Sequence, residues 1–292
     1  MAQRIVSVII PALNNENTIP FLLNALISCR EETLGFIKNI YVVSSSLDST
    51  DDIVLSYTSK FMDKGVKLQL IEDKPARGKC HSLNKCLKLI DSPYVLFLDA
   101  EIIDLPPDFL ERMMEYFSRD GVGAVAGRKQ PVSLGRIRNI ISCFWKIHDF
   151  SSRLKPKLSG SFMVVKRNLI PVFPENISVD DAWLEYIIRS RGVNIVYDHE
   201  VVAKVLEPHG LIEFIRQRIR VNRGYYFMIQ RYSWVPPASK PLVTLKAILW
   251  LIKQEPRYIG LILTLTCIEI LARVIALLEY IVSGDKGSWK KA

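Results

Sequence analysis

The sequence lacks the features that mark several common classes of protein. Its five cysteines are odd in number and form no CxxC motif, which excludes a small disulfide-bonded fold and predicts reduced thiols. No GxGxxG loop follows the first apolar segment, where the sequence reads PALNNE, and this argues against a nicotinamide or flavin enzyme. Internal repeats and low-complexity stretches are also missing. With 49% hydrophobic residues, the 292-residue chain has enough apolar surface to exclude a disordered protein.

Positive charge is in excess and is concentrated in the second half of the chain. There are 39 Lys and Arg against 30 Asp and Glu, a net charge of +9. Residues 204–257 hold ten basic and three acidic residues, and residues 136–157 hold six basic residues against Asp149 alone. This balance predicts an anionic partner such as a phosphorylated substrate or an acidic membrane. Nucleic acid is not an expected partner, because the basic residues are not interleaved with aromatic ones in a known module.

Strands and helices are predicted to alternate along the first hundred residues. Short apolar segments predict strands at 5–10, 40–43, 66–71 and 94–98, with helices at 18–29, 49–64 and 78–89. Such alternation predicts a mostly parallel sheet with helices on both faces and ligands at the C-terminal ends of the strands. The second half is less regular, with strands predicted at 124–126, 161–165 and 193–197 and helices at 106–117, 134–154, 180–190 and 211–232.

The tail of the chain is more apolar than the rest. Segment 242–252 is shorter than the ~20 residues that a helix needs to cross a bilayer, whereas segment 258–282 is long enough. At about 100° per residue, Glu269, Arg273 and Tyr280 fall on one side of that second helix, so it is amphipathic. These features predict a membrane-embedded or interfacial helical hairpin whose two ends stay cytosolic. The alternative is a soluble helical pair that closes a dimer or covers the catalytic domain.

Two carboxylates, Asp99 and Glu101, directly follow the apolar strand 94–98. Acidic side chains at this spacing can share a hard divalent cation, and the cation can neutralise a diphosphate. Lys79 opens the next helix upstream, where a basic residue at a helix N-terminus suits a phosphate. The simpler interpretations are a helix cap or turn for Asp99 and a solvated turn for Lys79.

Two further groups of polar residues mark the later helices. Asp180 and Asp181 stand at the start of a predicted helix, where one is expected to cap the helix and the other to be free as a general base. Gln217 and Arg220 lie on helix 211–232, and the guanidinium fork of arginine matches phosphate oxygens. The alternative for this basic helix is contact with lipid headgroups.

The ordered series of these motifs resembles the family 2 glycosyltransferases, which are inverting enzymes with a GT-A fold. The series is PALNNE, Arg77-Gly78-Lys79, Asp99-Ala100-Glu101, Asp180-Asp181 and Gln217-Arg218-Ile219-Arg220, and the resemblance spans residues 4–232. It implies a GT-A domain over 1–235, with a nucleotide-binding half at 1–98 and a metal and acceptor half at 99–235. Residues 236–292 would form the membrane-associated helical tail.

The resemblance also implies roles for individual residues. The donor-binding residues would be Pro11, Asn14, Glu16, Asp48, Lys79 and Asp99. Asp99 and Glu101 would hold Mg²⁺ or Mn²⁺, with His209 as a third candidate ligand. Asp181 would be the catalytic base, and Asp180, Gln217 and Arg220 would lie at the diphosphate and acceptor.

The activity implied by the resemblance is metal-dependent transfer of a sugar from a nucleotide sugar to an acceptor. Similarity to members with membrane-directed tails implies a lipid-linked acceptor, either a polyprenyl phosphate or a glycolipid or cell-envelope glycan, at the cytoplasmic face of the cell membrane. The C-terminal helices could also join copies into a homo-oligomer. Three departures keep an inactive membrane-associated scaffold as the alternative: serines precede Asp48, Glu101 replaces the commoner Asp, and Val221 replaces a Trp.

Overall fold

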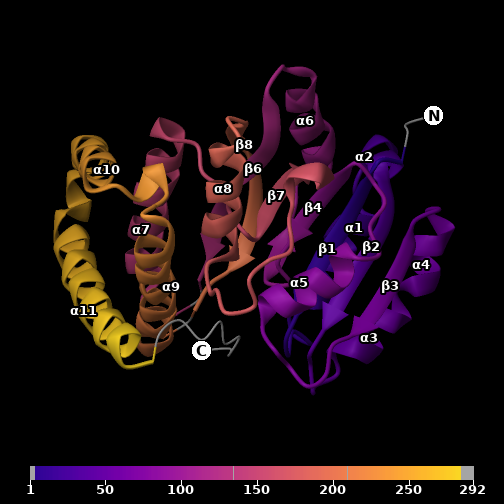
Figure 1. Ribbon diagram of the computed structural model, residues 1–292, viewed down its shortest axis with the longest axis horizontal. Coiled ribbons are helices and arrows are strands. Elements are labelled where there is room, and N and C mark those ends of the chain that lie inside the picture. The colour runs from indigo at the N-terminus through magenta and orange to yellow at the C-terminus, as the bar shows by residue number, and fades with distance from the viewer. Residues whose placement is uncertain (1–3, 134, 209, 284–292) are drawn as a thin grey trace.

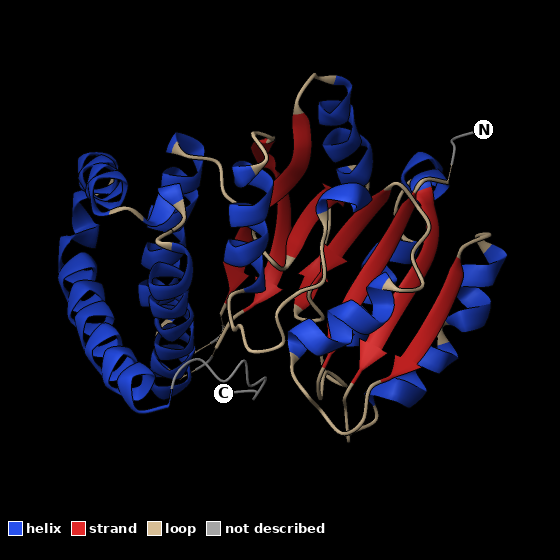
Figure 2. Ribbon diagram, in the orientation of Figure 1, coloured by secondary structure: helices blue, strands red, loops and turns tan. Residues whose placement is uncertain are grey.

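A mixed eight-stranded sheet is the centre of the molecule (Figure 2). The computed structural model describes residues 4–133, 135–208 and 210–283. The strand order is β3-β2-β1-β4-β7-β6-β8-β5. The strands are β1 (Val6–Ala12), β2 (Ile37–Ser44), β3 (Lys67–Glu72), β4 (Tyr94–Leu98), β5 (Ile102–Asp104), β6 (Val122–Val132), β7 (Phe162–Lys166) and β8 (Asn194–Leu206).

The first four strands form the parallel part that the sequence predicts. β1 pairs in parallel with β2 and β4, and β2 pairs in parallel with β3. Strand β1 is buried along its whole length, with Val8 in the core on one face and Ile9 in the core on the other. A strand covered on both faces reads as a continuous apolar segment, which is why this one could be predicted. The helices that cover this part are α1 (Ile19–Ile27), α2 (Glu31–Phe36), α3 (Thr50–Ser56), α4 (Thr58–Asp63) and α5 (Lys79–Leu87).

The second part of the sheet makes it mixed rather than mostly parallel. β7 runs antiparallel to both β4 and β6, while β6 pairs in parallel with β8. The predicted α/β class is confirmed, but β6 and β8 are much longer than predicted. Both strands continue past a register shift at Gly127/Arg128, and polar residues such as Asp198 and His199 interrupt the apolar pattern there. Helices α6 (Phe109–Glu115) and α8 (Asp180–Ser190) belong to this part.

Four longer helices form a separate layer beyond the β6–β8 end of the sheet (Figure 1). They are α7 (Arg138–Leu154), α9 (Leu211–Tyr232), α10 (Pro241–Gln254) and α11 (Ile259–Ser283). α10 packs on α7, and α11 packs on α9 and α7. Their shared core includes Ile141, Phe214, Leu251 and Ile262. The two apolar tail segments are therefore both helical, as predicted, and both pack on helices of the preceding domain.

Candidate active site

One large cavity of about 1050 Å³ lies between the sheet and the layer of long helices. At one end it is lined by Pro11 of β1, by Asp99 and Glu101 after β4, and by Gly160 and Ser161 just before β7. At the other end it is lined by apolar side chains of α10 and α11, among them Ile248, Ile262 and Leu265. Strand ends, helix α8 and the tail thus contribute to a single space.

Asp99 and Glu101 line the strand end of this cavity, as the sequence predicts. Asp99 donates its backbone N–H to the carbonyl oxygen of Ser161 at 3.1 Å, which ties it to the start of β7. Glu101 Oε1 accepts a hydrogen bond from Asn15 Nδ2 at 3.2 Å, and Asn15 follows β1. The two carboxylates are therefore held at the C-terminal ends of the central strands, where α/β proteins bind their ligands.

Lys79 connects this carboxylate pair to helix α8. Its ammonium lies 2.9 Å from Asp99 Oδ1 and 3.3 Å from Asp180 Oδ2. Burial lowers the pKa of Lys79, but Asp180 and Asp99 raise the pKa by more, so the ammonium stays charged. Burial raises the pKa of Asp180; Lys79 opposes that rise, and Asp181 adds to it. The charge of Lys79 is thus compensated within the protein.

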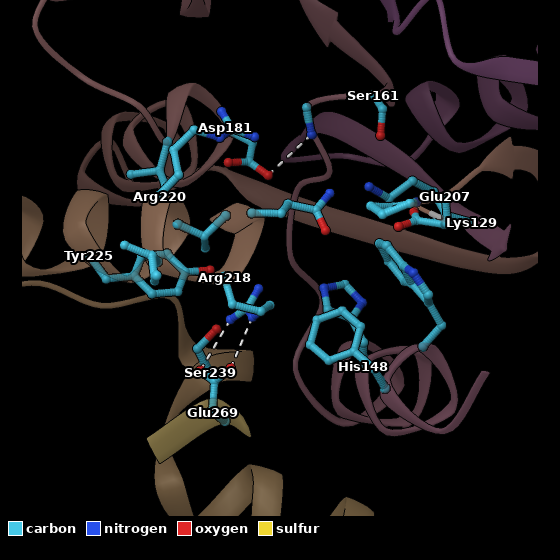
Figure 3. A pocket seen from close by; sticks show the side chains of 18 of the residues that line it. Lys129, His148, Ser161, Asp181, Glu207, Arg218, Arg220, Tyr225, Ser239 and Glu269 are labelled. Carbon is cyan, nitrogen blue, oxygen red and sulfur yellow. Dashed lines mark hydrogen bonds and ion pairs between the residues drawn. The ribbon is translucent and has the colours of Figure 1, made fainter. Parts of the chain in front are cut away.

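Asp181 is fixed by backbone N–H groups at the start of α8. Its Oδ2 accepts a hydrogen bond from Gly160 N–H at 3.2 Å, and its Oδ1 accepts one from Ala182 N–H at 2.8 Å (Figure 3). Space at position 160 is tight, because a Cβ there would lie 3.1 Å from Asp180 Oδ2 and 3.3 Å from Asp181 Cβ. The prediction that one of the two aspartates caps the helix is wrong, since α8 begins after Val179 without a side-chain cap.

Gln217 and Arg220 line the cavity from α9, as predicted, and Arg216 does so too. A close approach of α9 to the start of α8 places them there. At Gly224 a Cβ would lie only 2.7 Å from Val179 Cγ1, so this contact requires glycine. Within the described residues, Arg220 forms no hydrogen bond or ion pair, and its guanidinium faces the cavity unpaired.

Arg218, on the same helix, binds the tail. Its guanidinium donates two hydrogen bonds to the carboxylate of Glu269, at 2.9 and 3.2 Å (Figure 3). Asn222 Nδ2 donates a third to Glu269 Oε1 at 3.1 Å, and the Arg218 guanidinium lies 4.9 Å from the ring centre of Phe144. Glu269 belongs to α11, so these hydrogen bonds join the tail to α9, the helix with the predicted diphosphate-binding residues.

Asn14, Glu16 and Asp48 hold two loops together beside the cavity. Leu47 N–H donates to Asn14 Oδ1 at 2.9 Å, and Ser49 N–H donates to Glu16 Oε2 at 3.1 Å. Glu16 N–H in turn donates to Asp48 Oδ2 at 3.2 Å. Pro11 lines the cavity, but these three described residues do not. Their contact with a donor nucleotide stays a prediction.

The predicted metal ligands have the chemistry that a hard divalent cation needs. Mg²⁺ sites in phosphate-transferring enzymes use one or two carboxylates, with substrate phosphates completing the coordination. Asp99 and Glu101 supply two such carboxylates on one cavity wall. The described part of the chain holds no cluster of three acidic, His or Cys side chains placed for a metal. His209, the third predicted ligand, lies outside the described residues.

Several polar residues of the cavity were not singled out from the sequence. Lys129 of β6, His148 of α7 and Glu207 line it (Figure 3). Lys157 lines it too. Burial raises the pKa of Glu207 to about 7, although Lys129 opposes the shift. Burial lowers the pKa of His148 well below its usual value, and Lys157, Lys129 and Arg218 lower it further. Of these four residues, only Lys157 lies in a segment that the sequence marks as basic. Lys129 and Glu207 are far apart in the sequence, and the pairing of β6 with β8 brings them close together.

The cavity thus brings together carboxylates at the strand ends, an acidic pair at the start of a helix, and arginine on the helix opposite. The family model for "Glycosyl transferase family 2" matches residues 7–164, more than half of the chain. The chain therefore belongs to glycosyl transferase family 2. The predicted family, fold and enzyme class are confirmed.

The chain is also similar to known proteins beyond the matched segment. It is 25% identical over 266 residues to a poly-beta-1,6-N-acetyl-D-glucosamine synthase of Staphylococcus aureus, covering 84% of this chain and 62% of that protein. The counterpart in Staphylococcus epidermidis is 23% identical, over 81% of this chain and 58% of that protein. The chain thus spans about three fifths of the length of these relatives.

Solved structures share the fold. The structure of the mannosyltransferase PcManGT from Pyrobaculum calidifontis, in complex with GDP-Man and Mn²⁺, superposes with a TM-score of 0.64 at 23% identity. That match covers 97% of this chain and 76% of the other, so it includes much of the tail. Glucosyl-3-phosphoglycerate synthase from Mycobacterium tuberculosis, in complex with Mn²⁺, UDP-glucose and glycerol 3-phosphate, has a TM-score of 0.52 at 18% identity, over 76% of this chain and 79% of that one.

Proposed function

We propose that this protein is an inverting, metal-dependent glycosyltransferase that moves a sugar from a nucleoside diphosphate sugar to a lipid-linked acceptor at the membrane surface. One observation carries the proposal. The cavity that begins at Asp99, Glu101 and Asp181 ends among Ile262 and Leu265 of the apolar tail. An acceptor with a polar reacting group and an apolar chain could therefore place the first near the carboxylates and the second among the apolar side chains of the same cavity.

The strand end of the cavity would bind the donor. Asp99 and Glu101 would hold Mg²⁺ or Mn²⁺, which supplies positive charge to the leaving diphosphate. Arg220 faces the same cavity with an unpaired guanidinium, and its fork geometry suits phosphate oxygens. The use of GDP-Man with Mn²⁺ by a protein of the same fold is consistent with this assignment.

Asp181 would act on the acceptor. Each of its carboxylate oxygens accepts one backbone hydrogen bond, which fixes the side chain and leaves further lone pairs for a ligand. A carboxylate fixed in this way can accept the proton of an attacking hydroxyl. A single displacement inverts the anomeric carbon, so an α-linked donor should give a β-linked product, measured by NMR coupling constants; retention would contradict the mechanism.

The outer face of the tail supports contact with a membrane. Pro256–Ser283 is the one helix in the described part of the chain that is long and apolar enough to span a bilayer. However, its polar residues face α9: Glu279 pairs with Arg223, and Tyr280 hydrogen-bonds to Gln230. A spanning helix would have to break these contacts. We therefore propose that α11 lies in the plane of the membrane, at the cytoplasmic face, with its apolar side against lipid.

Exposed apolar side chains continue along both tail helices. They are Leu242, Leu245 and Leu249 of α10 and Ile259, Leu263, Ile270, Leu271, Val274, Leu277, Leu278, Ile281 and Val282 of α11. We call this set the tail surface. Large exposed apolar surfaces mark sites of contact with membranes or proteins. The basic residues Lys246, Lys253 and Arg257 stand beside it and favour anionic lipid.

Donor binding tests the proposal directly. The full chain is heated with UDP, GDP, CDP and dTDP sugars in the presence of Mn²⁺. We expect one nucleotide class to raise the stability by about 2.7 kcal/mol at a hundredfold excess over Kd. Asp99→Asn should abolish the shift. Asp104→Asn is the matched control, because Asp104 is half exposed and pairs with Lys204 away from the cavity.

Two results would contradict the proposed function. If no nucleotide sugar stabilises the protein, the inactive scaffold becomes the better interpretation. If Asp99→Asn and Asp104→Asn respond equally to the donor, the strand-end carboxylates are not the donor site.

A further inference from the structure

Two lysines of the cavity form no ion pair or hydrogen bond in the described part of the chain. Lys129 and Lys157 both line the cavity, and neither forms a hydrogen bond or an ion pair with any described residue. Other basic residues of the cavity are compensated: Lys79 by Asp99 and Asp180, and Arg218 by Glu269. An ammonium group taken out of water without a counter-charge is unfavourable.

The surroundings of the two lysines increase that cost. Burial lowers the pKa of Lys129, and the nearby charge of Lys157 lowers it further. The carboxylates of Glu207 and Asp99 act in the opposite direction and raise this pKa. Burial also lowers the pKa of Lys157, although Asp181 opposes the shift. Both cations act on the same imidazole, that of His148. The lysines therefore face a common space, in which neither forms an ion pair with a described residue.

The shape of this space favours the acceptor over the donor. The Lys129 ammonium lies 4.4 Å from the ring centre of Trp145, on helix α7 of the long-helix layer. Figure 3 shows Lys129 and His148 on one side of the cavity and Asp181 on the other. Phe144, Ile262 and Leu265 line the adjoining apolar part. An anion bound to the lysines would share the cavity with both the candidate base and these apolar side chains.

We infer that Lys129 and Lys157 bind a phosphate monoester of the acceptor, and that this phosphate is the group that receives the sugar. The inference rests on the proposed function and narrows its acceptor class. A phosphate oxygen forms a bond to the anomeric carbon while the bond from that carbon to the donor diphosphate breaks. The bonding electron pair leaves with the nucleoside diphosphate. The monoester is already ionised, so no proton has to be removed.

The phosphate could be carried by a lipid or by a small soluble molecule, and binding measurements separate the two. Titration calorimetry on the full chain in detergent would use farnesyl phosphate, farnesol and glycerol 3-phosphate as probes. The variants are Lys129→Met and Lys157→Met, which keep side-chain length and remove the charge. Lys155→Met is the matched control, because Lys155 lies in the same segment but is exposed and does not line the cavity.

We expect farnesyl phosphate to bind the native protein at least tenfold more tightly than farnesol does. Each cavity variant should weaken farnesyl phosphate binding about tenfold, as expected for loss of one hydrogen bond to a charged group. The control variant should bind like the native chain, and Lys129→Arg should recover part of the affinity. If glycerol 3-phosphate binds as tightly as farnesyl phosphate, the phosphate site stands and the acceptor is soluble.

Other outcomes would overturn the inference. Equal affinity for farnesol and farnesyl phosphate would show that the site does not recognise phosphate. If the variants lower the affinity for the nucleotide sugar and leave farnesyl phosphate binding unchanged, the lysines belong to the donor site. The probes need no donor, so their binding can succeed or fail independently of whether any nucleotide sugar stabilises the protein.

Discussion

The cavity has buried cations at both ends, and the protein compensates them at one end only. At the strand end, the ammonium of Lys79 lies within 3.3 Å of carboxylates from two different elements. Beside helix α7 of the long-helix layer, Lys129 and Lys157 form no ion pair or hydrogen bond with a described residue. Groups that are already paired hold the fold together, whereas groups that are left unpaired gain most from a ligand. The difference indicates that the site around Lys79 is already formed without a ligand. The site around Lys129 and Lys157 would gain its counter-charge only when an anion binds.

Asp181 is the candidate base of the cavity, and its substitution should show the largest effect. If the acceptor is a phosphate, Asp181→Asn should slow transfer to farnesyl phosphate by less than tenfold. Hydrolysis of the donor by water does require proton removal, so the same variant should slow that reaction by about 10²- to 10⁴-fold. Both rates can be measured as nucleoside diphosphate release, with and without farnesyl phosphate.

Equal losses in the two reactions would contradict this use of Asp181. They would show that the carboxylate positions the donor or the helix rather than accepting a proton. Ser178→Ala is unsuitable as a control because Ser178 lines the cavity. Asp104→Asn serves better, since that residue lies in β5 outside the cavity.

Lys79→Met should cause the largest loss of stability at the cavity. The substitution leaves the buried carboxylate of Asp180 and the less buried one of Asp99 without their cation. Breaking a fully buried pair costs about 3–5 kcal/mol, and partial exposure of Asp99 reduces the expected loss to about 2 kcal/mol. Urea unfolding without ligands measures it. Lys38→Met is the control, because both members of its pair with Asp91 are well exposed, by 40% and 70%, and its loss should change stability by under about 1 kcal/mol.

Substitution of Lys129, in contrast to that of Lys79, should raise the free energy of unfolding. Lys129→Met removes an unpaired charge, so the free energy of unfolding should rise by about 1 kcal/mol at neutral pH. The pKa of Lys129 is lowered in the folded protein from its ordinary value of 10.5. At a pH between the lowered pKa of the folded protein and 10.5, the lysine carries its proton in the unfolded chain more often than in the folded one. The free energy of unfolding of the native sequence therefore rises with pH in this range. The advantage of the variant should therefore fade toward pH 10.5. A loss of stability at neutral pH would mean that the lysine is compensated after all.

The sequence predicts the strand end of the cavity better than the other end. Asp99, Glu101 and Lys79 each follow or open an element whose apolar pattern is clear, so their meeting at one sheet edge can be predicted. The fully buried β1 and β4 carry that pattern. Lys129 and Glu207 lie on the polar continuations of β6 and β8, past a register shift, and only strand pairing brings them together.

The tail shows the same limit. Helical periodicity correctly places Glu269, Arg273 and Tyr280 on one face, because i, i+4 spacing is a local property. It does not reveal what that face contacts. The partner of Glu269 is Arg218, 51 residues away, and the contact depends on how α9 and α11 pack. Sequence periodicity thus predicted an amphipathic helix, while its attachment to α9 required the structure.

The smallest effect on the fold is expected on the tail surface. Leu263 and Leu278 are exposed by 64% and 60%, so Leu263→Glu and Leu278→Glu should each change the free energy of unfolding by under about 0.5 kcal/mol. Each leucine would contribute about 1.5–3 kcal/mol if it entered lipid, so binding to phosphatidylglycerol vesicles should fall at least about tenfold. Vesicle flotation measures this, and Val172→Glu, at a residue that is 77% exposed and lies outside the tail helices, should float like the native chain. If the tail variants float normally but sediment as smaller species, the tail surface joins copies of the chain instead of contacting lipid.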